Sequence, residues 1–130
     1  MITLGTGVGG GIIINGKILA GSHGAGGEIG HALVVRGEEE KCNCGNHGCL
    51  EQYASATGIV RVAGRVLAAS EDDSTLRELQ NITAKDVLDA FKAGDAVAVR
   101  IMEYVGDLLG GAIAGFTTVV DPEAIVIGGG

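Results

Sequence analysis

Residues 42–51 read CNCGNHGCLE and are the most informative part of this sequence. They contain all three cysteines of the 130-residue chain, in the spacing Cys-x-Cys-x4-Cys. Gly45 and Gly48 permit the sharp turns that let three thiols face one point. Because the number of cysteines is odd and the chain shows no secretion signal, a metal site is favoured over a disulfide framework.

A tetrahedral zinc site would need a fourth ligand at about 2.0–2.3 Å, and the chain offers His23, His31 and His47. His47 lies within the cysteine loop, where its short tether makes simultaneous ligation awkward. His31 belongs to a separate segment and would close the site across residues 32–41, so we favour it. Four protein ligands leave no open position, which predicts structural zinc. The alternative is three unligated thiols beside a core histidine.

Charge and composition argue against several classes of protein. Nine Lys and Arg against 16 Asp and Glu give a formal net charge of −7, and there are two Tyr, two Phe and no Trp. An acidic surface with few aromatic rings predicts no binding of nucleic acid by this segment. No apolar run reaches the roughly 20 residues of a membrane span. Without a signal peptide, we expect a cytoplasmic protein.

Glycine is unusually abundant, with 24 residues gathered mainly at positions 5–11, 21–30 and 128–130. Because glycine costs conformational entropy, such clusters indicate backbone turns or a close approach of the main chain to a ligand. Flexible loops are the alternative. The sequence begins and ends at such clusters, so we expect it to be a piece of a longer protein.

The remaining pattern predicts alternating strands and helices, the α/β class. Strands are expected at residues 1–4, 10–15, 17–20, 32–35 and 124–127. Helices are expected at residues 50–55, 57–69, 84–93 and 95–119. Asn15-Gly16 predicts a tight hairpin turn, and the isoleucine run 12–14 predicts a strand buried on both faces.

Local signals mark the ends of these helices. Thr57, Thr83 and Asp95 are the predicted N-caps, with Asp86 completing a capping box and Gly94 ending the third helix. Four glycines in the last helix predict close helix packing: Gly106, Gly110, Gly111 and Gly115. Between the helices, the glutamate run 38–40 predicts a solvated bend and residues 71–81 a polar surface connection.

Three segments together resemble the ROK family of repressors, open reading frames and sugar kinases. They are residues 4–11 (LGTGVGGG), 27–31 (GEIGH) and 42–51, and the likeness continues through residues 125–130 (IVIGGG). Within the family, the bacterial glucokinases look most similar. The resemblance implies part of an actin-like ATPase (ribonuclease H-like) sugar-kinase fold with a zinc-binding loop. Residues 1–130 would be a single C-terminal-lobe segment of a two-lobed kinase, without its N-terminal lobe.

The resemblance also implies roles for individual residues. The implied zinc ligands are His31, Cys42, Cys44 and Cys49. The implied contacts to sugar hydroxyls come from Glu28, His31 and Glu51, and carboxylates suit this task because they accept hydrogen bonds from hydroxyls. The implied nucleotide-binding residues are Gly5, Thr6 and Gly7 at the phosphates and Gly128 and Gly129 at the adenosine.

The implied reaction is transfer of the γ-phosphoryl group of ATP, with Mg²⁺, to a hexose, glucose first among the candidates. The catalytic Asp of such kinases belongs to the N-terminal lobe, and no Asp precedes Asp72 here. We therefore expect no catalytic residue in this chain, no activity of the chain alone, and a homodimeric full-length protein. The alternatives are a sugar-sensing ROK repressor and a zinc-stabilised binding module.

Overall fold

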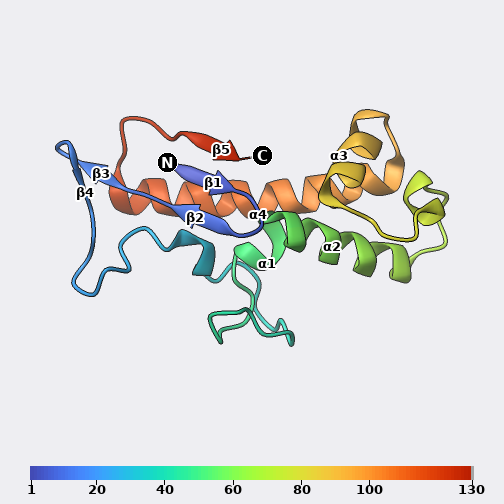
Figure 1. Cartoon of the computed structure of the whole chain (residues 1–130), viewed down its shortest axis with the longest axis horizontal. Coiled ribbons are helices and arrows are strands. Elements are labelled where there is room, and N and C mark those ends of the chain that lie inside the picture. Colours follow the sequence, from blue (N-terminus) through green and yellow to red (C-terminus); the bar gives the residue numbers. More distant parts are fainter. Residues whose placement is uncertain (130) are drawn as a thin grey trace.

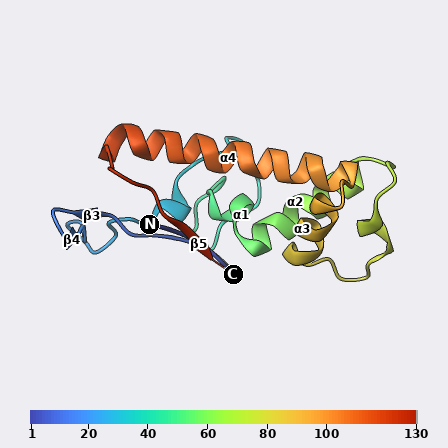
Figure 2. The ribbon, with the colours of Figure 1, turned by 90° about the horizontal axis from the view of Figure 1, so that it is seen from above.

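A three-stranded sheet and a group of helices lie at opposite ends of one long helix in the computed structural model, which describes residues 1–129 (Figures 1 and 2). The long helix is α4, Ala96–Val120. Its C-terminal half lies over the sheet end, and its N-terminal half packs on the other helices (Figure 2). This mixed α/β architecture agrees with the class predicted from the sequence.

The sheet has the order β2-β1-β5, with β1 at Ile2–Leu4, β2 at Val8–Gly10 and β5 at Ile127–Gly129. β1 and β2 are antiparallel and joined by the glycine turn, whereas β1 and β5 are parallel. The parallel register places Leu4 opposite Gly129. The two glycine segments, far apart in sequence, therefore adjoin at one end of the sheet. The last strand begins later than the predicted 124–127, and Gly130 lies outside the described residues.

The predicted hairpin forms from β3 (Ile13–Ile14) and β4 (Lys17–Ile18). Asn15 and Gly16 both have positive φ, as the tight turn requires. The expectation that the isoleucine run is buried on both faces is wrong, because Ile13 is 69% exposed. The hairpin is a separate two-stranded sheet, and no other described layer covers it.

Residues 32–35 do not form the predicted strand. Leu33 makes an isolated bridge with Cys49, and the N–H groups of Val34 and Val35 both donate to the carbonyl of Gly48. The segment is therefore held against the cysteine loop by single contacts instead of by a ladder. Just before it, the 3-10 helix η1 spans Ile29–His31.

The helices follow their capping residues closely. After the short α1 (Glu51–Ala54), α2 spans Ala56–Ala69, and its N-cap is Ser55. The predicted cap at Thr57 is wrong: Thr57 lies in the first turn of α2, and its hydroxyl donates to the carbonyl of Thr6. α3, Ala84–Lys92, begins with the predicted capping box of Thr83 and Asp86.

The predicted ends of the last two helices are confirmed. Gly94 has a φ of +83°, and Asp95 caps α4 by accepting hydrogen bonds from two backbone N–H groups. α4 ends at Val120, and its C-cap, Asp121, adopts the left-handed conformation just before Pro122. Here the local chemistry of caps and breakers is enough to define the helix boundaries.

The core lies where α1, α2, α3 and the N-terminal half of α4 meet. Its fully buried side chains include Leu50, Tyr53, Leu76, Val87, Val97 and Ile101. Leu76 comes from η2, Thr75–Glu78, inside the segment 71–81 predicted to be a polar surface connection. Among the described residues, no helix is both long and apolar enough to cross a bilayer.

The glycines of α4 do not pack closely against any described neighbour. A Cβ placed on any of the four would meet no atom within 4 Å. α4 has no buried residue beyond Val105. The predicted close packing is therefore wrong for residues 1–129, and this part of α4 has one open face.

Candidate metal centre and sugar site

One histidine and three cysteines converge from separate segments. His31 ends η1, Cys42 and Cys44 lie in the loop, and Cys49 precedes α1. One ligand atom from each lies within 4.8 Å of the other three. The Nδ1 of His31 is 3.8 Å from the Sγ of Cys42, and the sulfurs of Cys44 and Cys49 are 3.6 Å apart. The two separations of 3.6 and 3.8 Å match the edges of about 3.5–3.8 Å expected for a tetrahedron with zinc–ligand bonds of 2.0–2.3 Å, whereas the widest of the remaining pairs is up to 4.8 Å apart.

The loop reaches this geometry through two glycines with positive φ. Gly45 has a φ of +89° and Gly48 a φ of +70°, and a Cβ on Gly48 would collide with the carbonyl of Val35. Within the loop, the N–H of Cys42 donates to the carbonyl of Asn46 at 2.7 Å. Backbone conformation thus favours glycine at both positions, and space also requires it at Gly48.

Two of the three thiols have shifted pKa values, in opposite directions. Burial, reinforced by the neighbouring thiols, raises the pKa of Cys49 to about 12. The backbone N–H of Asn46 lowers the pKa of the exposed Cys44. Three adjacent thiolates repel one another, so the fully ionised set requires a positive charge among them. This donor set of three sulfurs and one imidazole suits Zn²⁺.

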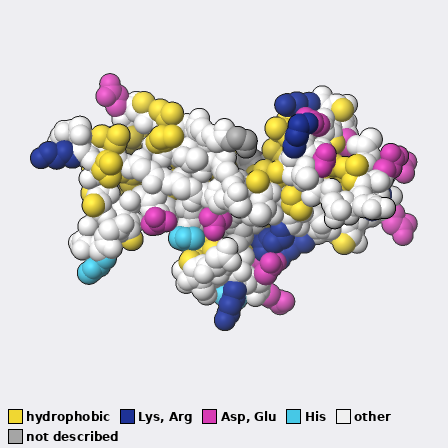
Figure 3. Space-filling view, viewed as in Figure 1, with side chains coloured by type: hydrophobic (Ala, Val, Ile, Leu, Met, Phe, Trp, Pro, Cys, Tyr) yellow, Lys and Arg dark blue, Asp and Glu magenta, His cyan; other side chains and the backbone are white. Residues whose placement is uncertain are grey.

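The three predicted sugar residues lie in the segments that flank the Cys–His cluster. His31 turns its Nδ1 toward Cys42, which leaves Nε2 for a different partner. Glu51 is the first residue of α1, two positions after Cys49, and its Oε2 accepts a hydrogen bond from the N–H of Val8 at 3.0 Å. Glu28 is exposed directly before η1. In Figure 3 a histidine adjoins acidic side chains on the face between the sheet and the cysteine loop.

The turn formed by residues 5–7, which is predicted to bind phosphates, packs against α2 and Glu51. The carbonyl of Gly5 accepts from the N–H of Ala56 at 2.8 Å, and the carbonyl of Thr6 accepts from the Thr57 hydroxyl at 3.0 Å. A Cβ on Gly7 would collide with the carboxylate of Glu51. The turn, the start of α2 and a predicted sugar residue therefore form one packed unit. Gly128 and Gly129 adjoin it through their pairing with Thr3 and Leu4.

The prediction of a solvated bend for the glutamate run holds for Glu39 and Glu40, which are exposed, and is wrong for Glu38. The side chain of Glu38 is only 4% exposed, and it pairs with Arg61 and Arg65 of α2. The Arg65 guanidinium holds the pKa of Glu38 well below its usual range. The two arginines, four residues apart and so on one face of a helix, were the available signal for a buried acidic partner.

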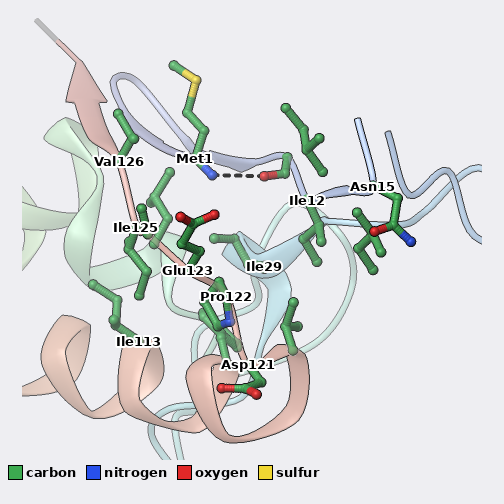
Figure 4. A pocket seen from close by; sticks show the side chains of 17 residues that line it. Met1, Ile12, Asn15, Ile29, Ile113, Asp121, Pro122, Glu123, Ile125 and Val126 are labelled. Carbon is green, nitrogen blue, oxygen red and sulfur yellow. Dashed lines mark hydrogen bonds between the residues drawn. The ribbon is translucent and has the colours of Figure 1, made fainter. Parts of the chain in front are cut away.

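A separate groove of about 700 Å³ lies between the hairpin, the C-terminal end of α4 and the segment leading to β5 (Figure 4). Its lining is mainly aliphatic and includes Ile12, Ile29, Ile113 and Ile125. None of the predicted metal, sugar or nucleotide residues lines it. The groove is therefore distinct from the Cys–His cluster and the glycine turn.

The chain belongs to the ROK family, whose model matches residues 1–130. It is 47% identical over 133 residues to a glucokinase of Halalkalibacterium halodurans, an alignment that covers 100% of this chain and 40% of that protein. The ROK glucokinase of Streptomyces griseus, solved in complex with glucose and AMPPNP, superposes with a TM-score of 0.87 and 37% identity. That match covers 99% of this chain and 43% of the solved one.

Regulators of the same family are also similar. The DNA-binding transcriptional dual regulator NagC of Escherichia coli is 41% identical over 124 residues, which cover 95% of this chain and 30% of that protein. The chain thus spans well under half the length of the relatives it matches. Its similarity extends to both the kinases and the regulators of the family.

Proposed function

We propose that residues 1–130 are a C-terminal-lobe segment of a two-lobed ROK kinase that phosphorylates a hexose, glucose first among the candidates, with ATP and Mg²⁺. The observation that carries the proposal is the contact between Glu51 and the glycine turn. It couples a carboxylate suited to sugar hydroxyls with a turn suited to phosphates. The similarity to glucokinases supports the same reading.

In this proposal, Glu28, His31 and Glu51 bind the sugar. Carboxylates select polyols because they accept hydrogen bonds from hydroxyl groups. Zinc held by His31, Cys42, Cys44 and Cys49 would be structural, since four protein ligands leave no position for a substrate. Its chemistry would be to offset most of the negative charge of the three thiolates. With Nδ1 of His31 directed at the metal, the Nε2–H of the same ring would be able to donate a hydrogen bond toward the sugar.

The nucleotide would lie along the two glycine segments. Backbone N–H groups of a glycine turn and a threonine hydroxyl are suited to phosphate oxygens. In the sheet, Gly128 and Gly129 pair beside the strand that enters Gly5, Thr6 and Gly7. Because Gly128 and Gly129 have no side chains, they would leave room for the adenosine. The base that removes the proton from the sugar hydroxyl is expected outside this chain.

The glutamate that joins both sites provides the test. We expect Glu51→Gln in the full polypeptide that contains residues 1–130 to lower kcat/KM for glucose about 10- to 100-fold. The reason is that a hydrogen bond to a charged acceptor contributes about 1.5–3 kcal/mol. A coupled assay with ATP and Mg²⁺ measures this, with the exposed Glu71→Gln as the control. Full activity of Glu51→Gln would contradict the proposal.

The second candidate is a sugar-sensing repressor, favoured by the likeness to NagC. It would keep the zinc and sugar residues but would have no use for ATP. Calorimetry with glucose and with an ATP analogue separates the two functions: binding of both supports the kinase, and binding of glucose alone supports the regulator. Binding of neither by the full polypeptide would support a zinc-stabilised binding module.

The expected homodimer is part of the same proposal. The open glycine face of α4 offers space for a second subunit, because a Cβ there would meet no described neighbour. Sedimentation of the full polypeptide tests it, and a monomer at micromolar concentration would contradict it.

A further inference from the structure

An ion-pair cluster centred on the buried carboxylate of Glu38 lies beside the Cys–His cluster without sharing any of its ligand atoms. The two carboxylate oxygens of Glu38 accept hydrogen bonds from Tyr53 at 2.5 Å, from Arg65 at 2.7 and 2.8 Å, and from Arg61 at 3.3 Å. A backbone N–H, that of Glu40, adds a further bond at 3.0 Å. The charge of Glu38 is therefore fully compensated although its side chain is only 4% exposed.

The cluster joins the loop to two helices. We call residues 38–49 the zinc loop. Glu38 begins it, whereas Arg61 and Arg65 lie one turn apart on α2, where basic side chains adjoin acidic ones (Figure 3). The guanidinium of Arg61 also lies over the Tyr53 ring, 4.9 Å from its centroid. Tyr53 packs edge-on against Tyr104 of α4, with ring centroids 6.2 Å apart.

A second set of hydrogen bonds connects the Glu38 cluster to the segments that contain the metal ligands and Glu51. The side-chain amide of Gln52 donates to the carbonyl of Glu40 at 3.0 Å and accepts from the N–H of Cys49 at 3.1 Å. Arg61 closes the network by donating its Nε–H to the carbonyl of Gln52 at 3.1 Å. Both ends of the zinc loop and the first turn of α1 are thus held by groups that bind no metal.

We propose that Glu38 is a positioning residue that keeps the zinc loop folded, with its donors assembled, in the absence of metal. The metal then enters a preformed site and does not have to order the loop. The proposal concerns the metal donors alone; its benefit for sugar binding through Glu51 rests on the proposed function.

Thiol accessibility in the metal-free chain tests this. Cys44 is exposed, whereas Cys42 and Cys49 are buried. After chelation of zinc, we expect the wild-type chain to react with a thiol reagent in one fast step at Cys44, with Cys42 and Cys49 at least about tenfold slower. Glu38→Gln should bring all three thiols close to the fast rate. Glu39→Gln, at an exposed neighbour, is the matched control.

Urea distinguishes a local role from a global one. If Glu38 holds the loop, the fast reaction of Cys49 in Glu38→Gln proceeds by local opening, and its rate is independent of urea below the unfolding transition. If the rate instead rises with urea at the slope of global unfolding, Glu38 acts on overall stability and the proposal is wrong. Three equally fast thiols in the metal-free wild type would also overturn it.

Zinc release provides a second readout on the loaded chain. We expect Glu38→Gln to lose zinc to a chelator about tenfold faster than Glu39→Gln, and an equal rate would contradict the proposal. If Glu38→Gln does not fold, Arg65→Gln replaces it, because Arg65 is half-exposed and sits at the outer side of the cluster. The same pattern of thiol rates, with a smaller change, is then expected.

Discussion

At Gly7, a missing side chain makes room for a functional one. The carboxylate of Glu51 occupies the space in which a Cβ of residue 7 would lie, and there it accepts a hydrogen bond from the N–H of Val8. Gly7→Ala should displace this carboxylate and leave the N–H of the buried Val8 without its partner, at a cost of about 1–3 kcal/mol. Urea unfolding of the 130-residue chain measures the loss. Gly9→Ala is the control, because a Cβ there meets nothing within 4 Å; equal stability of the two variants would rule out this account.

Individual residues also show how much of the site could be predicted from the sequence. The convergence of His31 with the three cysteines was predicted from spacing, because a short loop with glycines has few ways to arrange its sulfurs. That Glu38 is the acid which meets Arg61 and Arg65 could not be predicted in this way. Arg65 lies 27 positions away, and nothing local indicates that the loop folds back onto α2.

Among the elements, α4 is the one whose stability should depend most clearly on pH. Burial of the Asp95 carboxylate opposes its ionisation, but the N–H groups of Ala98 and Thr75 outweigh this and lower its pKa to about 2. Because the folded-state pKa lies below the ordinary 3.8, the stabilisation is complete above that value and is lost as the pH falls toward 2.

We therefore expect Asp95→Asn to cost about 0.5–1 kcal/mol at pH 7, since asparagine still caps but lacks the charge that favours a helix N-terminus. The difference from wild type should shrink toward zero near pH 2. Denaturant unfolding at several pH values measures it, with the exposed Asp107→Asn on the same helix as the control. A difference that stays constant with pH would contradict the assigned pKa.

The glycine face of α4 leads to a separate prediction. Gly111 has no described neighbour within 4 Å of an added Cβ, so Gly111→Ala should stabilise the 130-residue chain by about 0.5–1 kcal/mol. Gly94→Ala should destabilise it, because Gly94 has a φ of +83°. Thermal melts of both variants measure this. Destabilisation by Gly111→Ala would contradict this description of the glycine face as open.

For the whole molecule, metal removal separates two parts of the structure. The Cys–His cluster lies beside α1, whereas much of the core, including Val87, Val97 and Ile101, belongs to α3 and α4. We expect about one zinc per purified chain. Chelation should lower the melting temperature, because a ligand present at 1,000 times its Kd adds about 4 kcal/mol to the free energy of unfolding. It should leave most of the helical circular dichroism signal unchanged. No metal by elemental analysis, or an unchanged melt after chelation, would count against the zinc site.

The sequence by itself determined the features that depend on neighbours a few positions away. These include the capping box of α3, the start and end of α4, the hairpin turn and the glycine turns of the cysteine loop. Each follows from hydrogen bonds or backbone angles within a short segment, so the residue types carry the information.

Only the tertiary structure decided which surfaces are covered and which distant groups meet. In the folded chain the isoleucine hairpin is exposed, and Glu38 is buried in an ion pair with Arg61. Glu51 accepts a hydrogen bond from the N–H of Val8, 43 positions away. An apolar run is buried only if another layer reaches it, and a charge is buried only if its partners arrive from elsewhere in the chain. These outcomes depend on the path of the whole backbone, which no local pattern specifies.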